Sequence, residues 1–298
     1  MEGRCHRPVG RRAGEAVSIE RPAAHAGPTD VMQSGERPRF LPHPRQLTWR
    51  GDSFSLLDGR LIALHSGEPQ ALSFAGGQLQ AALEDRFGLT WHLVAGSAVP
   101  ADQVGARLIV LPEALSHPQG YRLTVATDGI VVQAPGPAGV FYAICTLKQL
   151  LSQLDEPIVP GLEILDWPDF PSRGVMLDIS RDKVPTMETL FELVDRLASW
   201  KINQFQLYTE HTFAYRNHPV VWSGASPMTA RQIMALDATC RERFVELVPN
   251  QSSFGHMRRW LSTSPMPIWP RPTASSTSRG GAWRAHSPCP RRSPAAWS

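Results

Sequence analysis

The sequence predicts an α+β domain followed by an incomplete (β/α)8 TIM barrel of about three βα units, with disordered ends. Three observations lead to this fold class. A hairpin and an amphipathic helix stand in the first half, strands and helices alternate between Pro171 and Leu261, and neither end has apolar periodicity. Hydrophobic residues make up 42% of the 298 residues, which is enough to form the cores of two domains.

Both ends are expected to be irregular. Residues 1–40 are rich in Arg, Gly, Ala and Pro and bury too little surface to order themselves, so we expect a disordered extension or a start codon assigned too early. Residues 262–298 contain no Asp, Glu, Val or Leu. A reading-frame shift in a GC-rich gene would produce this composition, and a low-complexity tail is the alternative. The domains expected between the ends are 41–156 and 157–261.

The α+β domain begins with two short strands, Ser53–Leu57 and Leu61–Leu64, around a turn at Asp58–Gly59. Apolar residues at helical spacing then predict a helix over Ser73–Phe87. Gly88 follows this helix directly and is a suitable cap, because glycine adopts the left-handed conformation without steric strain.

The second half of this domain contains its clearest local signal. Arg107–Leu111 is typical of a strand. Tyr121–Ala126 and Ile130–Gln133 are joined by Thr127–Asp128–Gly129, which predicts a β-hairpin. Ala138–Leu151 is then an amphipathic helix. No catalytic cluster is visible in this domain, so we expect it to serve as a structural packing domain.

Beyond Pro171 the order of elements changes to strand, helix, strand, helix, strand. Strands separated by helices indicate parallel βαβ units, and polar residues gather just after each strand. In a (β/α)8 barrel the carboxyl ends of the strands carry the active site. The expected elements are Val175–Ile179, Met187–Trp200, Gln204–Tyr208, Thr229–Arg243 and Phe244–Pro249.

Composition excludes several classes of protein. The net charge of +3 is too small to indicate a nucleic-acid partner, and a folded basic face is absent. No apolar run approaches the roughly 20 residues that span a membrane. The N-terminal arginines are not followed by an apolar segment, so we expect no signal peptide and a cytoplasmic location. The cysteines have no metal-ligand spacing, so we expect reduced thiols and no metal or other cofactor: Cys5, Cys145, Cys240 and Cys289.

Several ordered segments resemble one enzyme family. DFPSRGVMLDISRDKVP, WKINQFQLYTEHTFAY and VELVPNQSSFGHMRRWL resemble the opening third of the catalytic domain of glycoside hydrolase family 20, the β-N-acetylhexosaminidases. The preceding domain, with LPHPRQLTW near its start and AGVFYAICTLKQLL at its end, is similar to the α+β domain before the barrel in that family. The resemblance covers residues 41–261.

The resemblance implies roles for charged residues around the first barrel strand. Arg173 matches the arginine that holds hydroxyls of the terminal sugar, and a planar guanidinium suits two adjacent hydroxyls. The alternative for Arg173 is a structural salt bridge to Asp178 or Asp169. Asp178 and Arg181 match the LD-x-SR element, for which we expect an ion pair that orders the loop after the strand.

Further roles fall after the second and third barrel strands. Glu210 matches an acidic position that is usually Asp, and His256 matches the histidine of the family's PGH motif. A Glu210–His256 pair would bind substrate or orient the histidine by accepting its N–H, and a simple hydrogen bond at the rim is the alternative. His211 stands beside Glu210, and Asn250 and Gln251 are expected to offer polar contacts at the end of the third strand.

Chemistry in this family is substrate-assisted: the 2-acetamido oxygen of the sugar attacks C1, an Asp orients the acetamide, and the adjacent Glu protonates the leaving oxygen. That pair follows the fourth strand, and we predict no catalytic residue in this chain. The implied activity removes terminal N-acetylhexosamine, of gluco or galacto configuration, from an oligosaccharide or glycoconjugate. We expect this chain to be inactive, and a non-catalytic carbohydrate-binding or scaffolding module is the alternative.

Overall fold

The computed structural model describes residues 37–96, 99–181 and 183–262, and these form two compact units that divide after Trp167. Unit 1 denotes the described residues up to Trp167, and unit 2 those from Pro168 onward. The irregular ends expected at 1–40 and 262–298 lie almost wholly outside the described residues, as do Cys5 and Cys289. Cys145 and Cys240 are buried free thiols.

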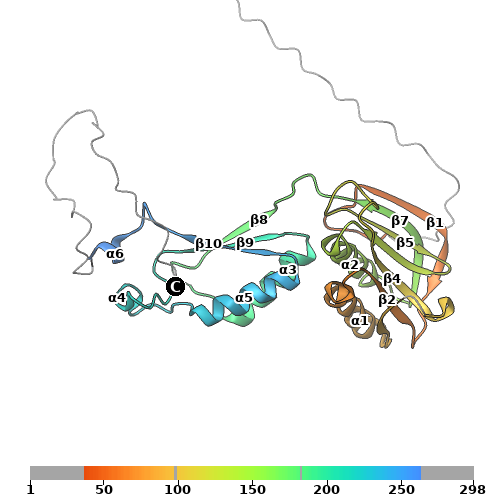
Figure 1. The fold of residues 1–298 in the computed structure, drawn as a ribbon, viewed down its shortest axis with the longest axis horizontal. Coiled ribbons are helices and arrows are strands. Elements are labelled where there is room, and N and C mark those ends of the chain that lie inside the picture. The colour runs from red at the N-terminus through yellow and green to blue at the C-terminus, as the bar shows by residue number, and fades with distance from the viewer. Residues whose placement is uncertain (1–36, 97–98, 182, 263–298) are drawn as a thin grey trace, which may run out of the picture. The chain divides into compact units, whose positions relative to one another are not determined.

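Unit 1 is a seven-stranded mixed sheet with two helices on one side (Figure 1). The strand order is β1-β7-β5-β6-β4-β2-β3. The helices are α1 (Ser73–Phe87) and α2 (Pro137–Leu151), with short 3-10 turns at Pro69–Leu72 and Ala101–Gln103. The strands are β1 (Gln46–Ser55), β2 (Leu61–His65), β3 (His92–Ala95), β4 (Val104–Val110), β5 (Tyr121–Ala126), β6 (Gly129–Ala134) and β7 (Ile158–Asp166).

Local sequence signals account for much of unit 1. The predicted hairpin is confirmed, because β5 and β6 pair antiparallel with Val125 opposite Ile130. Helix α1 has the predicted bounds, and Gly88 caps it in the left-handed conformation at φ 68°, where its N–H donates to the carbonyl of Glu84 at 2.8 Å. Helix α2 is buried almost all round because it packs against both the sheet and α1.

Two parts of unit 1 differ from the prediction. The segment that forms β7 was assigned to the second domain without a predicted strand, but it pairs antiparallel with β1 on one side and β5 on the other. The domain boundary expected after residue 156 therefore moves to Trp167. The strands on either side of Asp58–Gly59 do not pair with each other: β1 is an edge strand beside β7, and β2 lies between β3 and β4. Local turn chemistry does not specify such non-local partners.

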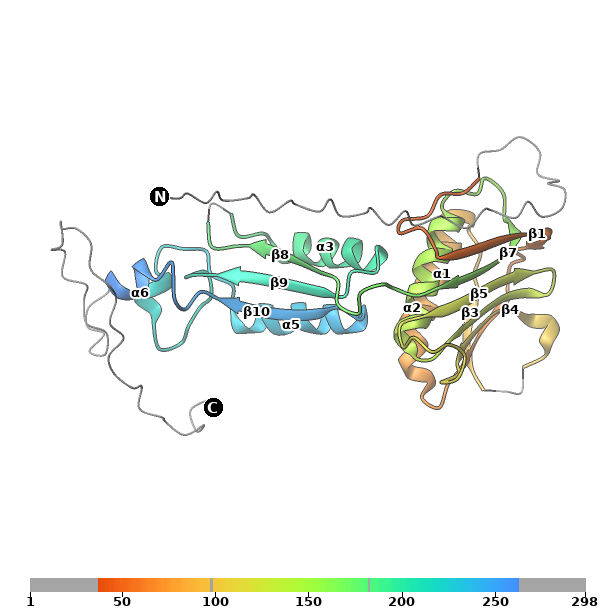
Figure 2. The ribbon, with the colours of Figure 1, turned by 90° about the horizontal axis from the view of Figure 1, so that it is seen from above.

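Unit 2 is a three-stranded parallel sheet with strand order β10-β9-β8. Helices α3 (Met187–Ser199) and α5 (Ala230–Glu242) cover one face of this sheet (Figure 2). The strands are β8 (Gly174–Asp178), β9 (Gln204–Thr209) and β10 (Glu246–Gln251), and two short helices are α4 (Pro219–Trp222) and α6 (Arg258–Ser262). The predicted strand and helix alternation is confirmed.

Capping and periodicity explain the helices of unit 2. Thr186 caps α3 by accepting the N–H of Thr189 at 3.2 Å, and Thr229 and Gln232 form a reciprocal capping box on α5. The apolar face of α3 is buried, as in Leu190 and Val194. Among the described residues, no helix is long and apolar enough to cross a membrane.

A buried polar network joins three elements of unit 1. Thr146 of α2 lies 2.7 Å from the Tyr121 hydroxyl of β5, which in turn donates to the carboxylate of Asp166 at the end of β7 at 2.9 Å. Burial, and then the charge of Asp166, raise the pKa of Tyr121 well above its ordinary value. The network therefore ties the carboxyl end of β7 to the centre of the unit.

We expect Thr146→Val to lower the free energy of unfolding by about 1–3 kcal/mol, because an isosteric apolar side chain leaves the buried Tyr121 hydroxyl short of a partner. The matched control is Thr239→Val on α5. The Thr239 hydroxyl donates to the carbonyl of Ala235, four residues earlier, and this bond lies at the surface. The expected effect of this control is within about 0.5 kcal/mol. Urea unfolding of the full chain measures both, and equal losses would contradict the role of the network.

Candidate functional site

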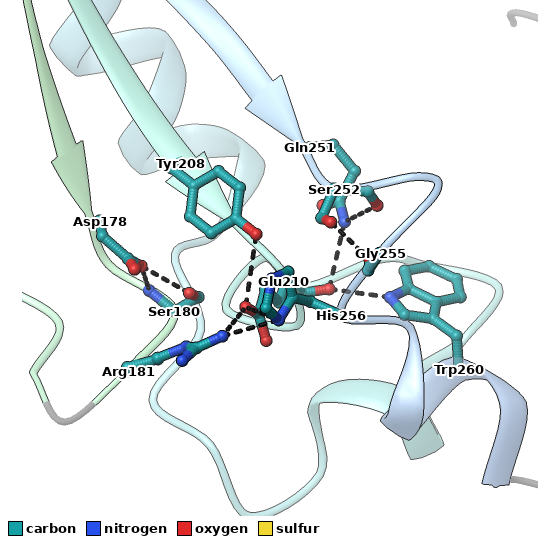
Figure 3. Close-up of polar contacts among 10 residues, drawn as sticks. All are labelled: Asp178, Ser180, Arg181, Tyr208, Glu210, Gln251, Ser252, Gly255, His256 and Trp260. Carbon is teal, nitrogen blue, oxygen red and sulfur yellow. Dashed lines mark hydrogen bonds and ion pairs between the residues drawn. The ribbon is translucent and has the colours of Figure 1, made fainter.

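The loops that follow the three strands of unit 2 meet at one edge of the sheet, because parallel strands end on the same side. Three side chains come together there, one from each loop (Figure 3). The Arg181 guanidinium donates through one nitrogen, Nη2, to Oε1 of Glu210 at 3.1 Å and to Nδ1 of His256 at 2.7 Å. The same His256 nitrogen lies 3.5 Å from Oε1 of Glu210.

The three members of this Arg181–Glu210–His256 cluster differ in exposure. The side chain of Glu210 is 13% exposed, whereas those of Arg181 and His256 are 57% and 55% exposed. A guanidinium can only donate, so Nδ1 of His256 accepts and the imidazole carries its proton on Nε2 in this arrangement. The cluster therefore combines a largely buried acceptor, the Glu210 carboxylate, with two exposed donors, Arg181 and His256.

Two neighbouring side chains add to the polar edge. The Tyr208 hydroxyl donates to Oε1 of Glu210 at 3.4 Å. Asp178 accepts the N–H of Ser180 at 2.8 Å and also its hydroxyl. Burial raises the pKa of the Asp178 carboxyl, but the Ser180 donors and the charge of Arg181 outweigh it, so the pKa lies below its ordinary value. Arg181 thus forms its ion pair with Glu210 and not with Asp178, the expected partner.

The structure does not bring Arg173 to this cluster. Arg173 precedes β8, at the opposite end of the strand from Asp178, and its guanidinium donates to the main-chain carbonyls of Lys201 at 2.8 Å and Phe170 at 2.7 Å. The expectation of a sugar contact there is corrected to a structural role in holding the amino edge of the sheet. Charged residues flank this strand at both ends, and only those that follow it, such as Asp178 and Arg181, lie at its carboxyl edge.

Of the other predicted residues, some lie at the carboxyl edge of the sheet and others lie away from it. Gln251 lies at the carboxyl edge and donates to the carbonyl of Glu210 at 3.2 Å. Asn250 points to the other face of β10, where its amide lies 3.5 Å from Gln206. His211 is half-buried, and burial followed by the charge of Arg259 lowers the pKa of its imidazole.

Sequence reasoning missed Trp260, whose indole N–H donates to the carbonyl of Glu210 at 2.8 Å. Its only signal is an aromatic residue at the end of the last segment with helical character, HMRRWL, which is weak.

The described residues place no acidic pair beside the cluster. The adjacent Asp155–Glu156 lie in the turn before β7 of unit 1, while Asp237 is paired with Arg241 along α5. Within the same part of the chain, no group of three or more His, Cys, Asp or Glu residues is arranged to hold a metal ion. The arrangement can bind a polar ligand at one edge of the sheet.

The family model for glycosyl hydrolase family 20, domain 2, matches residues 37–167, which are the described residues of unit 1. Similarity continues into unit 2, since a Porphyromonas gingivalis beta-hexosaminidase is 26% identical over 252 residues and 76% of this chain. Residues 37–167 thus match a domain of glycosyl hydrolase family 20, and the chain as a whole is similar to enzymes of that family. The N,N'-diacetylchitobiase of Vibrio harveyi is 29% identical over 175 residues, or 57% of this chain.

Solved structures of family 20 enzymes share the fold. The β-N-acetylhexosaminidase of Streptomyces coelicolor superposes with a TM-score of 0.66 at 23% identity, over 76% of this chain and 49% of that one. The chain spans 18% of the length of the Vibrio harveyi relative and 31% of the Porphyromonas gingivalis one.

We expect the stability contributed by Asp178 to depend on pH. The folded-state pKa is the lower one, so this contribution is present above the unfolded value of about 3.9 and is lost as the pH falls through the folded-state pKa. Because the carboxylate is exposed, the difference between wild type and Asp178→Asn is at most about 1 kcal/mol. Urea midpoints between pH 7 and pH 2.5 measure it. Ser180→Ala should reduce the pH dependence, and identical profiles for wild type and Asp178→Asn would contradict the assignment.

Proposed function

We propose that the protein to which this chain belongs is a β-N-acetylhexosaminidase-like glycosidase that removes terminal N-acetylhexosamine by substrate-assisted, retaining hydrolysis. In this proposal unit 2 supplies the first three βα units of a (β/α)8 barrel. The observation that carries it is the Arg181–Glu210–His256 cluster at the carboxyl edge of the parallel strands, where barrels of this kind bind substrate.

The cluster suits adjacent sugar hydroxyls for a chemical reason. Each hydroxyl donates one hydrogen bond and accepts others, so a site that holds it needs both kinds of partner. Glu210 is an ionised acceptor, while Arg181 donates from a planar fork that spans two neighbouring oxygens. His256 supplies an Nε2–H donor on the solvent side. We therefore assign substrate binding to Arg181, Glu210 and His256, with Arg181 in the role first expected for Arg173.

A non-catalytic carbohydrate-binding module is the second candidate. It is favoured by the presence of all three cluster members among the described residues, without any acidic pair beside them. Binding without hydrolysis by the 298-residue chain is common to both candidates. They differ in whether the intact protein contributes an Asp–Glu pair from elsewhere.

We expect Arg181→Lys to weaken binding of N-acetylglucosamine about tenfold, because a lysine loses the second donor of the planar fork. Arg173→Lys is the matched control: it should lower the melting temperature, because Arg173 holds main-chain carbonyls, and leave sugar affinity unchanged. Titration of the full chain with the sugar, followed by NMR, measures affinity. Loss of binding in Arg173→Lys with none in Arg181→Lys would reverse the assignment.

We expect the 298-residue chain to release no nitrophenol from nitrophenyl N-acetylglucosaminide above the blank. The described residues hold no Asp and Glu adjacent in sequence at the carboxyl edge, and residues 262–298 contain no carboxylate side chain. An active family 20 hexosaminidase assayed in parallel is the positive control. Release that rises in proportion to the concentration of purified chain would refute the expected inactivity.

A further inference from the structure

We infer that Gln251 and Trp260 are positioning residues for Glu210, acting on its main-chain carbonyl and not on its carboxylate. This inference rests on the proposed substrate-binding role of Glu210. Gln251 Nε2 donates to the Glu210 carbonyl oxygen at 3.2 Å and Trp260 Nε1 donates to the same oxygen at 2.8 Å (Figure 3). The two donors come from the end of β10 and from α6, so both ends of the loop that carries His256 are tied to one peptide group.

The Glu210 carbonyl needs these two donors because Glu210 lies just beyond the end of β9. Thr209 is the last residue of β9, and its carbonyl still accepts the N–H of Ser252 at 3.0 Å. Glu210 is one residue beyond the strand, where the parallel ladder no longer fixes the peptide plane. Two donors on one carbonyl fix that plane, and with it the direction in which the Glu210 side chain leaves the main chain.

Tyr215 joins the two donors to each other. Its hydroxyl donates to Oε1 of Gln251, which also accepts from Thr209 at 2.9 Å, so the Gln251 amide is held with its nitrogen toward Glu210. The Tyr215 ring meets the Trp260 ring edge-on, with ring centroids 5.1 Å apart. We call Gln251, Trp260 and Tyr215 the carbonyl clamp.

The residues around the Glu210 carboxylate differ from those that hold its main-chain carbonyl. Arg181 and His256 touch only its side chain, and neither touches the clamp through a hydrogen bond in the described structure. The clamp therefore sets the direction of the side chain, and Arg181 and His256 complete the ligand-facing surface. A variant that loses the clamp should leave Arg181 present but deprived of its carboxylate partner.

Trp260→Phe tests the inference, because it removes the indole N–H and retains an aromatic ring against Tyr215. Gln251→Met is the second variant, since it removes the other donor at nearly constant length. The matched control is Trp222→Phe: Trp222 also donates its indole N–H to a main-chain carbonyl of the same loop, that of Tyr215 at 3.0 Å, whereas the clamp uses the hydroxyl and ring of Tyr215. All variants are made in the full chain.

The first measurement needs no sugar. NMR exchange rates of the Arg181 guanidinium protons report whether the Glu210 carboxylate still holds them. We expect about 3- to 10-fold faster exchange in Trp260→Phe and Gln251→Met, the equivalent of one neutral hydrogen bond, and no change in Trp222→Phe. Equal exchange rates in wild type and both clamp variants, whatever their melting temperatures, would overturn the inference.

The second measurement is affinity for N-acetylglucosamine, which should fall about 3- to 10-fold in the two clamp variants and stay unchanged in Trp222→Phe. An equal loss in all three variants would mean a general loosening of the loop and would overturn positioning. If wild type binds no sugar but the clamp variants still accelerate Arg181 exchange, the clamp stands and the proposed substrate-binding role of the cluster fails.

Discussion

The parallel direction of β8, β9 and β10 is the constraint on which the candidate site depends. A return connection follows β8 and another follows β9, and both cross the same face of the sheet, so the three carboxyl ends share an edge. Side chains separated by 29 and 75 residues, Arg181 with Glu210 and with His256, meet there without any strand being distorted. A single antiparallel strand would have sent one of them to the opposite edge.

Periodicity and capping sufficed to predict α1, α3 and the β5–β6 hairpin, because the signals of these elements are contained within each segment. Strand partners were not predictable in the same way. The segment that forms β7 contains Pro160 and Gly161, which are typical of a linker, and its place between β1 and β5 is determined by contacts far away in sequence. The buried Asp166 then ends the strand inside unit 1.

Only some of the residues of the site were predicted from the sequence. Glu210 and His256 were predicted from the resemblance of their segments to glycoside hydrolase family 20, and each of them follows a strand. Arg173 and Arg181 flank one strand, and only Arg181 follows it, so the direction of the chain favours Arg181, whereas the resemblance had assigned the sugar to Arg173. Trp260 was not predicted, because its hydrogen-bond acceptor is a main-chain carbonyl. Every residue has such a carbonyl, so the sequence does not show which one a side chain will bond.

The clamp also explains how the cluster is held beside an uncovered part of the sheet. Among the described residues β10 has no strand beyond it, and a hollow of about 410 Å³ lies against it, lined by apolar side chains such as Ile233 and Leu247. In the proposed barrel a following βα unit would cover this surface. Tyr215 lines the hollow and belongs to the clamp, so a βα unit that packed into the hollow would contact Tyr215. The ring of Tyr215 meets Trp260, and its hydroxyl bonds Gln251. Covering the edge of the sheet and orienting Glu210 are therefore coupled through one aromatic side chain.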